Sequence, residues 1–507
     1  MYLASAEQIP AIDRMACETL WTDVKTLMYN AAHCMYNRLI RLAKPSDSIV
    51  ILCGKGNNGG DGYALACELA ESGFCVKAIN VFSVPPRSEA ALFYYERCRE
   101  TLDVLAYHED PQRAESLVNN ADHIVEAVFG TGFSGDAKAP ADRLFAIANA
   151  SSAIRHAADI PGGIHADDGS VGQSVFQADY TYTFAIGKRG LYSYPAREFA
   201  GEITVEDIGI PDKLITDHFP LTAYLTDEAY IRQTLKKRAL NTNKGDYGRL
   251  LAFVGSRDMT GAASLCLKGA LRTGVGLSVL ASEQAVVDAV RLRLEEPIYL
   301  PLPTENGVYG QKALDALIHA SQKASACVMG CGLGQALSDS SLISALIETL
   351  DLPLILDADA LNALEGNTDV LKKAKHTPIL TPHPKEFSRL CGQSVADVQA
   401  NRIRLALDFA AEHRVVLVLK GAATVIALPD GRLFLNSTGN PGLSKGGSGD
   451  VLAGMIASFA AQGYTAEESA VCAVYLHGKA ADEMKNELSE SGFLPSDLPL
   501  KVASLLP

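Results

Sequence analysis

The sequence predicts an α/β protein with two domains, each built on a mainly parallel sheet. Its 507 residues exceed the usual size of one domain. Short β-branched runs alternate with longer helical patterns, which is typical of parallel sheets covered by helices. The alternation stops near residue 211 and restarts near residue 243. The strand-like runs are Ser48–Cys53, Val76–Phe82, His123–Val128, Tyr180–Ile186, Leu250–Gly255, Ala326–Gly330, Leu354–Asp357 and Val415–Lys420.

The boundary between the domains is expected near Pro220. The intervening segment, DKLITDHFPLTAYLTDEAYIRQTL, lacks the succession of strand, Gly-rich loop and helix that precedes and follows it. We therefore predict domains at residues 1–215 and 224–507.

Composition and charge exclude several functional classes. Acidic residues outnumber basic residues 59 to 45, giving a net charge of −14, whereas nucleic-acid binding needs a basic surface. A nucleotide remains possible because backbone N–H groups can hold phosphate on an acidic protein. The 11 cysteines have no repeating spacing, which predicts reduced thiols and a cytoplasmic protein. No secretory start and no apolar stretch of about 20 residues is visible, so no membrane partner is expected.

The first Gly-rich loop, GKGNNGGDG, follows a predicted strand. Gly54, Gly56 and Gly59 match the G-x-G-x-x-G dinucleotide pattern. A dehydrogenase would also carry an acidic residue at the end of the second strand, and VKAINVF has none. Hydride transfer is therefore disfavoured. The polar run Asn57–Asp61 indicates either a site or a solvated Asx-rich turn.

Two further polar clusters follow predicted strands. Glu126 lies inside an apolar strand, where a carboxylate is costly unless it is paired or binds a cation. The small residues of Gly130–Asp136 can expose consecutive N–H groups as an anion-binding nest. Asp159 precedes Pro161 at another strand end. Because the carboxyl ends of parallel strands line the ligand crevice, the three clusters together predict a site.

The motifs GNNGGDG, VEAVFGTGFSG, DIPGGIHADDG and FAIGKRGL, in this order, resemble the NAD(P)H-hydrate epimerase domain over about Met1–Pro211. The resemblance implies a Rossmann-like three-layer domain and a potassium ion held by Asn58, Glu126 and Gly162. The family usually has Asp and Ser at the last two positions. Asp159 is the candidate acid–base group, and Asp61 is the alternative. The residues implied to contact the hydrate are Asn57, Asn58, Gly59, Gly60, Asp61, Gly130, Thr131, Gly132, Phe133, Ser134, Gly135, Asp136 and Asp159.

The strongest single motif, NPGLSKGGSGDVLAGM, places three glycines before Asp450 and an apolar helical pattern. A Gly-rich turn at a helix N-terminus forms an anion site, and Asp450 could act as base toward an attacking hydroxyl. The simpler alternative is an Asp that caps the helix. Lys420 could neutralise phosphate or lie on the surface. His383 lies between two prolines. Asp357 and Asp359 could each be a helix cap, a turn residue or a site residue.

The motifs NKGDYGRLL, VGS…TGAA, GCGLG, DADAL, TPHPKEF, KGAAT and GNPGLSKGGSGDVLAG resemble the ADP/ATP-dependent NAD(P)H-hydrate dehydratases from about Tyr224 onward. The resemblance implies a ribokinase-like three-layer domain, with ADP or ATP as co-substrate and magnesium as cofactor. Asn243, Cys331 and Ser448 replace a frequent His, Pro and Thr. The implied hydrate contacts are Ala262, Gly334, His383 and Asp450. The implied nucleotide contacts are Lys420, Gly421, Ala422, Ala423, Thr424 and Gly449.

Together the two halves predict a bifunctional nicotinamide-cofactor repair enzyme. One domain would interconvert R- and S-NAD(P)H hydrate, and the other would dehydrate the S form at the expense of ADP or ATP. The alternative is a ribokinase-class small-molecule kinase fused to a non-catalytic nucleotide-binding scaffold. We expect a homo-oligomer, and we expect the Asp450 turn, the Lys420 loop and His383 to meet at one pocket.

Overall fold

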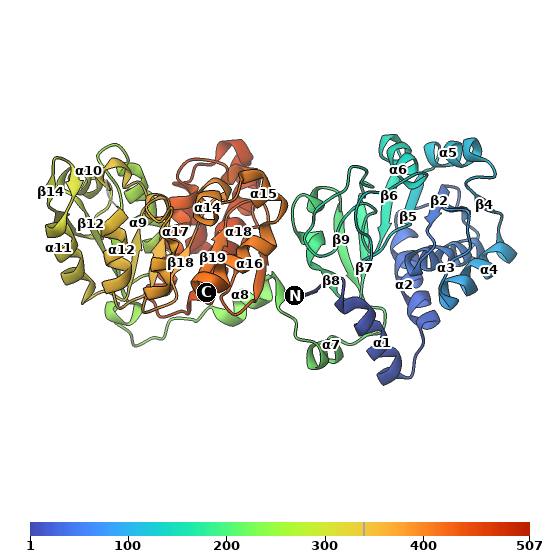
Figure 1. The fold of residues 1–507 in the computed structure, drawn as a ribbon, viewed down its shortest axis with the longest axis horizontal. Coiled ribbons are helices and arrows are strands. Elements are labelled where there is room, and N and C mark those ends of the chain that lie inside the picture. The colour runs from blue at the N-terminus through green and yellow to red at the C-terminus, as the bar shows by residue number, and fades with distance from the viewer. Residues whose placement is uncertain (338–339) are drawn as a thin grey trace. The chain divides into compact units, whose positions relative to one another are not determined.

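The computed structural model describes residues 1–337 and 340–507, and the chain divides into two compact units. The front unit comprises Tyr2–Tyr224, and the rear unit comprises Leu225–Pro507 together with Met1. Both units are mixed α/β structures with parallel sheets (Figure 1). Among the described residues, no helix is both long enough and apolar enough to span a membrane.

The front unit has a parallel sheet in the order β4-β3-β2-β5-β6-β7-β9. The chain leaves β2 toward β3 and β4 and then returns to place β5 beside β2. The loops after β2 and β5 therefore open at a topological switch point, where ligands bind in such sheets. The strands are β2 (Ser48–Cys53), β3 (Cys75–Asn80), β4 (Val104–Ala106), β5 (His123–Ala127), β6 (Ile154–Ala158), β7 (Tyr180–Phe184) and β9 (Glu202–Glu206).

Alternate residues of the front strands feed two separate cores. In β2, Ile49 and Ile51 face one core, which includes α2, α3 and α4, whereas Val50 and Leu52 face the other, which includes α5 and α6. Helices therefore cover both faces, giving the three-layer arrangement of a Rossmann-like domain. The helices are α1 (Gln8–Leu20), α2 (Val24–Leu39), α3 (Asn57–Glu71), α4 (Glu89–Thr101), α5 (Pro111–Asn119), α6 (Ala141–Ala150) and α7 (Asp212–His218).

A short ladder completes the front unit. Strand β1 (Tyr2–Ala4) pairs in parallel with β8 (Gly187–Lys188) and antiparallel with β10 (Ala223–Thr226). This ladder fixes the backbone of Lys188, whose side chain is buried.

The sheet of the rear unit runs β13-β12-β11-β16-β17-β18-β19-β20-β21. Pairing is parallel from β13 to β19 and antiparallel from β19 to β21. A hairpin of β14 (Thr304–Glu305) and β15 (Val308–Tyr309) lies apart from this sheet. The sheet strands are β11 (Arg249–Phe253), β12 (Leu277–Glu283), β13 (Ile298–Leu302), β16 (Ala326–Met329), β17 (Leu354–Leu356), β18 (Ile379–Leu380), β19 (Val416–Leu419), β20 (Val425–Ala427) and β21 (Leu433–Asn436).

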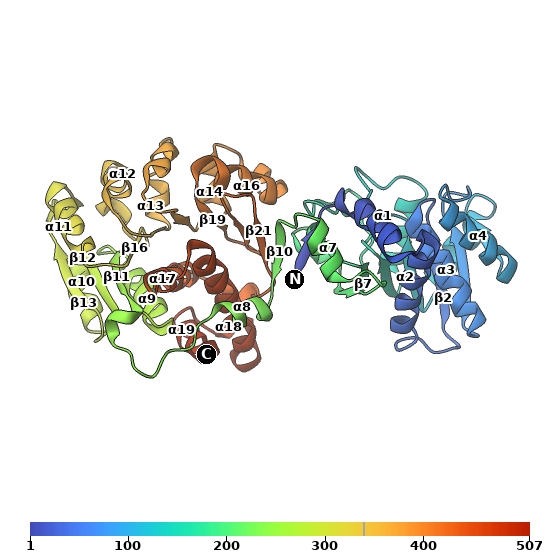
Figure 2. The same ribbon diagram turned by 90° about the horizontal axis from the view of Figure 1, so that it is seen from below.

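Helices cover both faces of the rear sheet as well, as expected for a ribokinase-like domain (Figure 2). On one face lie α9 (Thr260–Arg272), α17 (Ser448–Ala461) and α18 (Ala466–Gly492). The opposite face carries α12 (Ser340–Thr349), α14 (Pro384–Cys391) and α16 (Arg402–His413). The remaining helices are α8 (Glu228–Thr234), α10 (Gln284–Arg291), α11 (Gln311–Ser321), α13 (Asp359–Asn362), α15 (Val395–Ala400) and α19 (Leu498–Leu505).

Helix α17 is apolar and buried along most of its length, so it forms the centre of its layer. Glycine allows it to pack closely against α9. A Cβ at Gly269 or Gly454 would collide with the backbone of Val451 or Cys266 on the other helix. This close packing fixes the first turn of α17, which carries Asp450.

Candidate active sites

The front unit contains a cavity of about 970 Å³ at the carboxyl ends of its strands. Most of the residues expected to contact the hydrate line it. Gly59, Gly60 and Gly135 do not. A Cβ at Gly59 would meet the backbone of Gly54, and one at Gly60 would lie 2.7 Å from the Ala91 Cβ, so both glycines permit packing. The predicted residues on the cavity wall are Asn57, Asn58, Asp61, Gly130, Thr131, Gly132, Phe133, Ser134, Asp136 and Asp159.

Asp159 follows β6 in a left-handed conformation, with φ of 65°. Few non-glycine residues adopt this conformation, which costs about 1–3 kcal/mol and needs support from neighbours. The support is visible. The Asp159 N–H donates to the Tyr182 carbonyl at 2.8 Å, and the Thr183 hydroxyl donates to Asp159 Oδ1 at 3.2 Å. These contacts orient the carboxylate on the cavity wall.

A buried lysine pairs with Asp159. Lys188 Nζ lies 2.6 Å from Asp159 Oδ1 and donates to the Phe184 carbonyl at 2.8 Å, and the residue is only 1% exposed. A buried cation requires such partners. The sequence motif FAIGKRGL contains Lys188, but nothing in the motif alone assigns it to this contact.

Two more carboxyl groups share this wall. Burial, followed by repulsion from Asp159 and Asp13, raises the pKa of Asp61 well above its usual range. Burial also raises the pKa of Asp13 to about 6, although Lys188 opposes that shift. The environment of Asp61 therefore favours its protonated form. Asp13 comes from α1, and the sequence analysis did not identify it.

Of the three residues expected to hold potassium, Glu126 contacts the Gly162 backbone, and both Asn58 and Glu126 form hydrogen bonds with the backbone of Phe129. Oxygen Oε1 of Glu126 accepts the Val128 N–H at 2.8 Å, and Oε2 accepts the Gly162 N–H at 2.8 Å. Burial raises the pKa of Glu126 to about 7, against the effect of these hydrogen bonds. The amide nitrogen of Asn58 donates to the Phe129 and Ala158 carbonyls, whereas its buried Oδ1 has no partner among the described residues.

In the rear unit, Asp450 lies in the first turn of α17, after Gly447 with φ of 108°. Free N–H groups and the positive end of the helix dipole converge here, which suits an anion. Burial, followed by repulsion from Asp357, raises the pKa of Asp450 to about 7, although Lys420 opposes the shift. Asp450 is therefore poised to accept a proton near neutral pH.

Lys420 reaches the same turn from the end of β19. Its Nζ lies 2.9 Å from Asp357 Oδ1 and 4.0 Å from Glu386 Oε2. A Cβ at Gly449 would lie 3.4 Å from this amine. Burial lowers the pKa of Lys420, but Asp357 and Glu386 outweigh it and leave the pKa raised. The lysine thus stays charged beside the helix N-terminus.

His383 is the N-cap of α14. Its Nδ1 accepts the Lys385 and Glu386 N–H groups at 3.1 and 3.2 Å, and its Nε2 lies 3.3 Å from Glu386 Oε1. The side chain is 48% exposed. Glu386 therefore lies between His383 and Lys420, and Lys420 lies near Gly449 in the Asp450 turn.

The loop after Lys420 has a strained but supported backbone. Ala423 has φ of 49° and Gly421 has φ of 146°. The buried Arg402 donates to the Leu419 and Lys420 carbonyls, and the Thr424 hydroxyl donates to the Gly421 carbonyl at 3.0 Å. Ala422 belongs to the same turn. The loop is thus preorganised at the strand end.

Ala262 and Gly334 lie together around Met259. The Ala262 N–H donates to the Met259 carbonyl at 3.2 Å, and a Cβ at Gly334 would lie 2.8 Å from Met259 Cε. The Gly334 N–H donates to Asp359 Oδ2 at 2.7 Å. The sequence did not decide whether Asp359 is a turn residue or a site residue. In the structure its carboxylate orients the Gly334 loop.

Sequence reasoning left Asp357 undecided and missed Glu386. Asp357 follows β17, and its Oδ1 accepts hydrogen bonds from Lys420 at 2.9 Å and from the Thr381 hydroxyl at 2.7 Å. Glu386 is buried at the third position of α14 and completes a capping box with His383. The spacing between His383 and Glu386 could have indicated this box.

These features define a two-domain α/β enzyme with a polar cavity in the front unit and, in the rear unit, a group of polar residues around Lys420, His383 and Asp450, which we call the rear pocket. Residues 250–502 match the family described as NAD(P)H-hydrate dehydratase, and residues 24–190 match the YjeF-related protein N-terminus. The bifunctional NAD(P)H-hydrate repair enzyme of Moorella thermoacetica is 36% identical over 506 residues, covering 98% of this chain and 95% of the relative. That of Thermofilum pendens is 35% identical over 97% of this chain and 94% of the relative. The chain belongs to the family of bifunctional NAD(P)H-hydrate repair enzymes.

A solved structure resembles the rear unit. The ADP/ATP-dependent NAD(P)H-hydrate dehydratase of Bacillus subtilis, co-crystallised with ATP and Mg²⁺, is 34% identical with a TM-score of 0.48. The match covers 56% of this chain and 97% of that chain.

Proposed function

We propose that the front cavity interconverts the R and S hydrates of NAD(P)H and that the rear pocket dehydrates the S hydrate with ADP or ATP. The observation that carries this proposal is the match to bifunctional relatives along 98% of the chain. Both pockets hold proton-transfer groups in the parts of the chain that the two family matches cover.

In the rear pocket, Asp450 takes the proton of the substrate hydroxyl as its oxygen attacks the terminal phosphorus of the nucleotide. The bond from that phosphorus to the nucleotide oxygen breaks, and a phosphate ester forms. Hydroxide is a poor leaving group, whereas phosphate leaves readily. The ester then loses phosphate while the neighbouring ring carbon loses a proton, which restores the dihydropyridine.

Charge neutralisation at the rear pocket comes from Lys420 and the N-terminus of α17. The Gly421–Thr424 turn and Gly449 bind the nucleotide phosphates through their backbone N–H groups. Magnesium is usually held by one or two carboxylates together with phosphate oxygens. Asp357 supplies such a carboxylate here, so the donor set fits the ion, which would offset the phosphate charge when bound. Ala262, Gly334 and His383 form the hydrate side of the pocket.

In the front cavity, the hydrate hydroxyl meets an acid and a base on the same wall. Burial raises the pKa of Asp61 well above its usual range, which favours the protonated acid. The Asp159 carboxylate is oriented by Lys188 and Thr183. Asp61 can protonate the departing hydroxyl, and Asp159 can accept a proton from the water that adds back to the ring carbon. The Gly130–Asp136 loop holds the remainder of the cofactor.

Potassium fits the point between Asn58, Glu126 and Gly162 in part. The unpartnered Asn58 Oδ1 and the Glu126 carboxylate are oxygen donors, which suit a hard cation. Gly162 contributes only its carbonyl, which already accepts the Phe176 N–H at 2.8 Å. The ion would stabilise the loops after β2 and β5 rather than take part in proton transfer.

An assay with an equal mixture of R- and S-hydrated NADH, ADP and Mg²⁺ tests both activities. Recovery of dihydronicotinamide absorbance should approach completion, because epimerisation converts the R hydrate into the S hydrate. Recovery of only the S portion would contradict the front assignment. No recovery from the S hydrate would contradict the rear assignment.

A further inference from the structure

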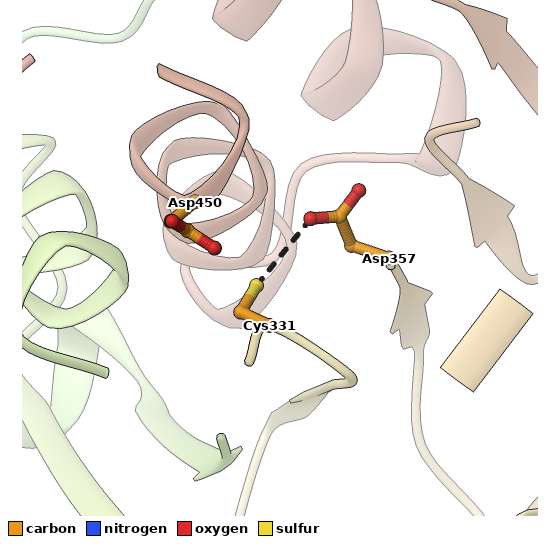
Figure 3. A group of neighbouring side chains, drawn as sticks. All are labelled: Cys331, Asp357 and Asp450. Carbon is orange, nitrogen blue, oxygen red and sulfur yellow. Dashed lines mark hydrogen bonds between the residues drawn. The ribbon is translucent and has the colours of Figure 1, made fainter. Parts of the chain in front are cut away.

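Three side chains with metal-binding atoms meet at the rear pocket. Cys331 follows β16, Asp357 follows β17 and Asp450 lies in the first turn of α17 (Figure 3). One potential ligand atom from each lies within 4.8 Å of the other two. The Cys331 thiol donates to Asp357 Oδ2 at 3.5 Å, and both residues are buried. Sulfur and carboxylate oxygen therefore point at a common centre.

A second thiol lies against the first. Cys266 on α9 is hydrogen-bonded to the Cys331 thiol, and this contact, followed by burial, raises the pKa of Cys331 well above its usual range. A cation that prefers sulfur can displace the proton of the Cys331 thiol, because metal binding to cysteine requires the thiolate.

We propose that Cys331, Asp357 and Asp450 form a binding site for a thiophilic divalent cation such as zinc or cadmium. Binding replaces the Cys331 S–H bond with a sulfur–metal bond and releases the proton to solvent. Two carboxylates and one thiolate then balance the dication and the Lys420 ammonium. Cysteine with Asp is an established zinc donor set, whereas magnesium takes oxygen ligands only.

Occupation of this site has a functional consequence. The ion would bind the carboxylate of Asp450 that the proposed function uses as base, and it would stand at the N-terminus of α17. Thiophilic cations should therefore inhibit the ADP-dependent reaction in the presence of magnesium. This consequence rests on the proposed function, whereas the binding itself does not.

The surroundings distinguish this cluster from another acidic group in the rear unit. Asp369, Glu412 and His413 also bring potential ligand atoms within 4.8 Å of one another. Two of these residues are exposed, and Lys372 already pairs with both carboxylates. That group has no thiol, so it offers no preference for soft cations.

Cadmium titration of the chelator-treated full-length protein tests the binding directly. Sulfur-to-cadmium charge-transfer absorbance reports thiolate ligation and does not depend on activity. Cys331→Ser should lose one equivalent of this signal and weaken its binding at least about tenfold. Cys327→Ser is the matched control. The Cys327 side chain, on β16, is buried like that of Cys331 but lies outside the cluster. Equal titrations of the wild type and Cys331→Ser would overturn the proposal.

A crystal soaked in cadmium provides an independent measurement if Cys331→Ser does not fold. An anomalous-difference peak between Cys331, Asp357 and Asp450 supports the site, and its absence at saturating cadmium overturns it. Zinc inhibition of the wild type with Mg²⁺ and ADP, reversed by chelator, should be weakened at least about tenfold in Cys331→Ser. Metal binding without any ADP-dependent turnover would contradict the proposed function while leaving the metal site intact.

Discussion

The pH dependence of the rear reaction tests the role of Asp450 as a base. Burial and repulsion from Asp357 together raise the pKa of Asp450 to about 7, against the opposing effect of Lys420. The base acts in its deprotonated form, so the rate should fall as the pH drops through this value. A group with that pKa is ionised to roughly 9% at pH 6 and roughly 91% at pH 8. Single-turnover rates should therefore differ about tenfold between these two pH values.

Lys420→Met is the informative perturbation. It removes the cation that lowers the Asp450 pKa, so the rising limb of the rate profile should move to higher pH. Single-turnover measurement with saturating S hydrate and ADP isolates the chemical step from nucleotide affinity, which this variant should also weaken. Lys372→Met makes the same change of charge in an exposed ion pair with Asp369 and should leave the limb in place.

Asp450→Asn should abolish the limb and lower the rate by about 10²–10⁴-fold. The reasoning is refuted by a wild-type profile that is flat between pH 6 and pH 8. It is also refuted if the limb persists at the same pH in Lys420→Met, because the lysine would then have no electrostatic influence on the base.

Asp159→Ala should slow epimer exchange by about 10²–10⁴-fold while S-hydrate dehydration continues. Chromatographic separation of the two hydrates measures the exchange, and an undiminished rate would exclude Asp159 as the acid–base group. Lys188→Met breaks a buried ion pair and should lower the unfolding free energy of the front unit by about 3–5 kcal/mol, measured by urea denaturation; a change below 1 kcal/mol, on the order of a surface pair, would contradict the contact. Potassium should raise the melting temperature more at pH 8 than at pH 6, because burial raises the pKa of Glu126 to about 7 and the ion binds its charged form; the difference should vanish in Glu126→Gln. Gly454→Ala should destabilise the rear unit by about 1–3 kcal/mol in calorimetry, because a Cβ there meets the backbone of α9; an unchanged melting temperature would show that the helices can separate.

The strands were predictable because each is a short β-branched run that the sheet buries. Ser48–Cys53 is predicted and observed with the same bounds, and Leu354–Asp357 is observed as Leu354–Leu356. The segment after Pro211 was harder, since its elements carry no Gly-rich loop. It forms the short helices α7 and α8 with β10 between them, and Asp227 caps α8 by accepting the Tyr230 N–H.

The position of the front cavity also followed from the sequence, because polar loops after parallel strands meet at one edge of the sheet. The residues that tune its charge did not. Asp13 reaches the cavity from α1, in a segment without a Gly-rich motif, and Lys188 comes from β8. Their roles depend on which distant carboxyl groups they meet, and local pattern contains no information on that pairing.

The two pockets share one electrostatic arrangement, a buried lysine–carboxylate pair beside a second carboxyl group. In each unit a buried lysine pairs with one carboxylate, Lys188 with Asp159 and Lys420 with Asp357, whereas the neighbouring Asp61 or Asp450 forms no direct ion pair with any described residue. An unpaired carboxyl group in a buried site holds its proton to higher pH, so each pocket gains a group suited to proton transfer near neutrality. The two units differ in the groups that surround this carboxyl group. In the rear unit Asp450 lies in the first turn of α17 with the Lys420 amine close to that turn, so a hydroxyl that Asp450 deprotonates would lie beside groups that can hold phosphate.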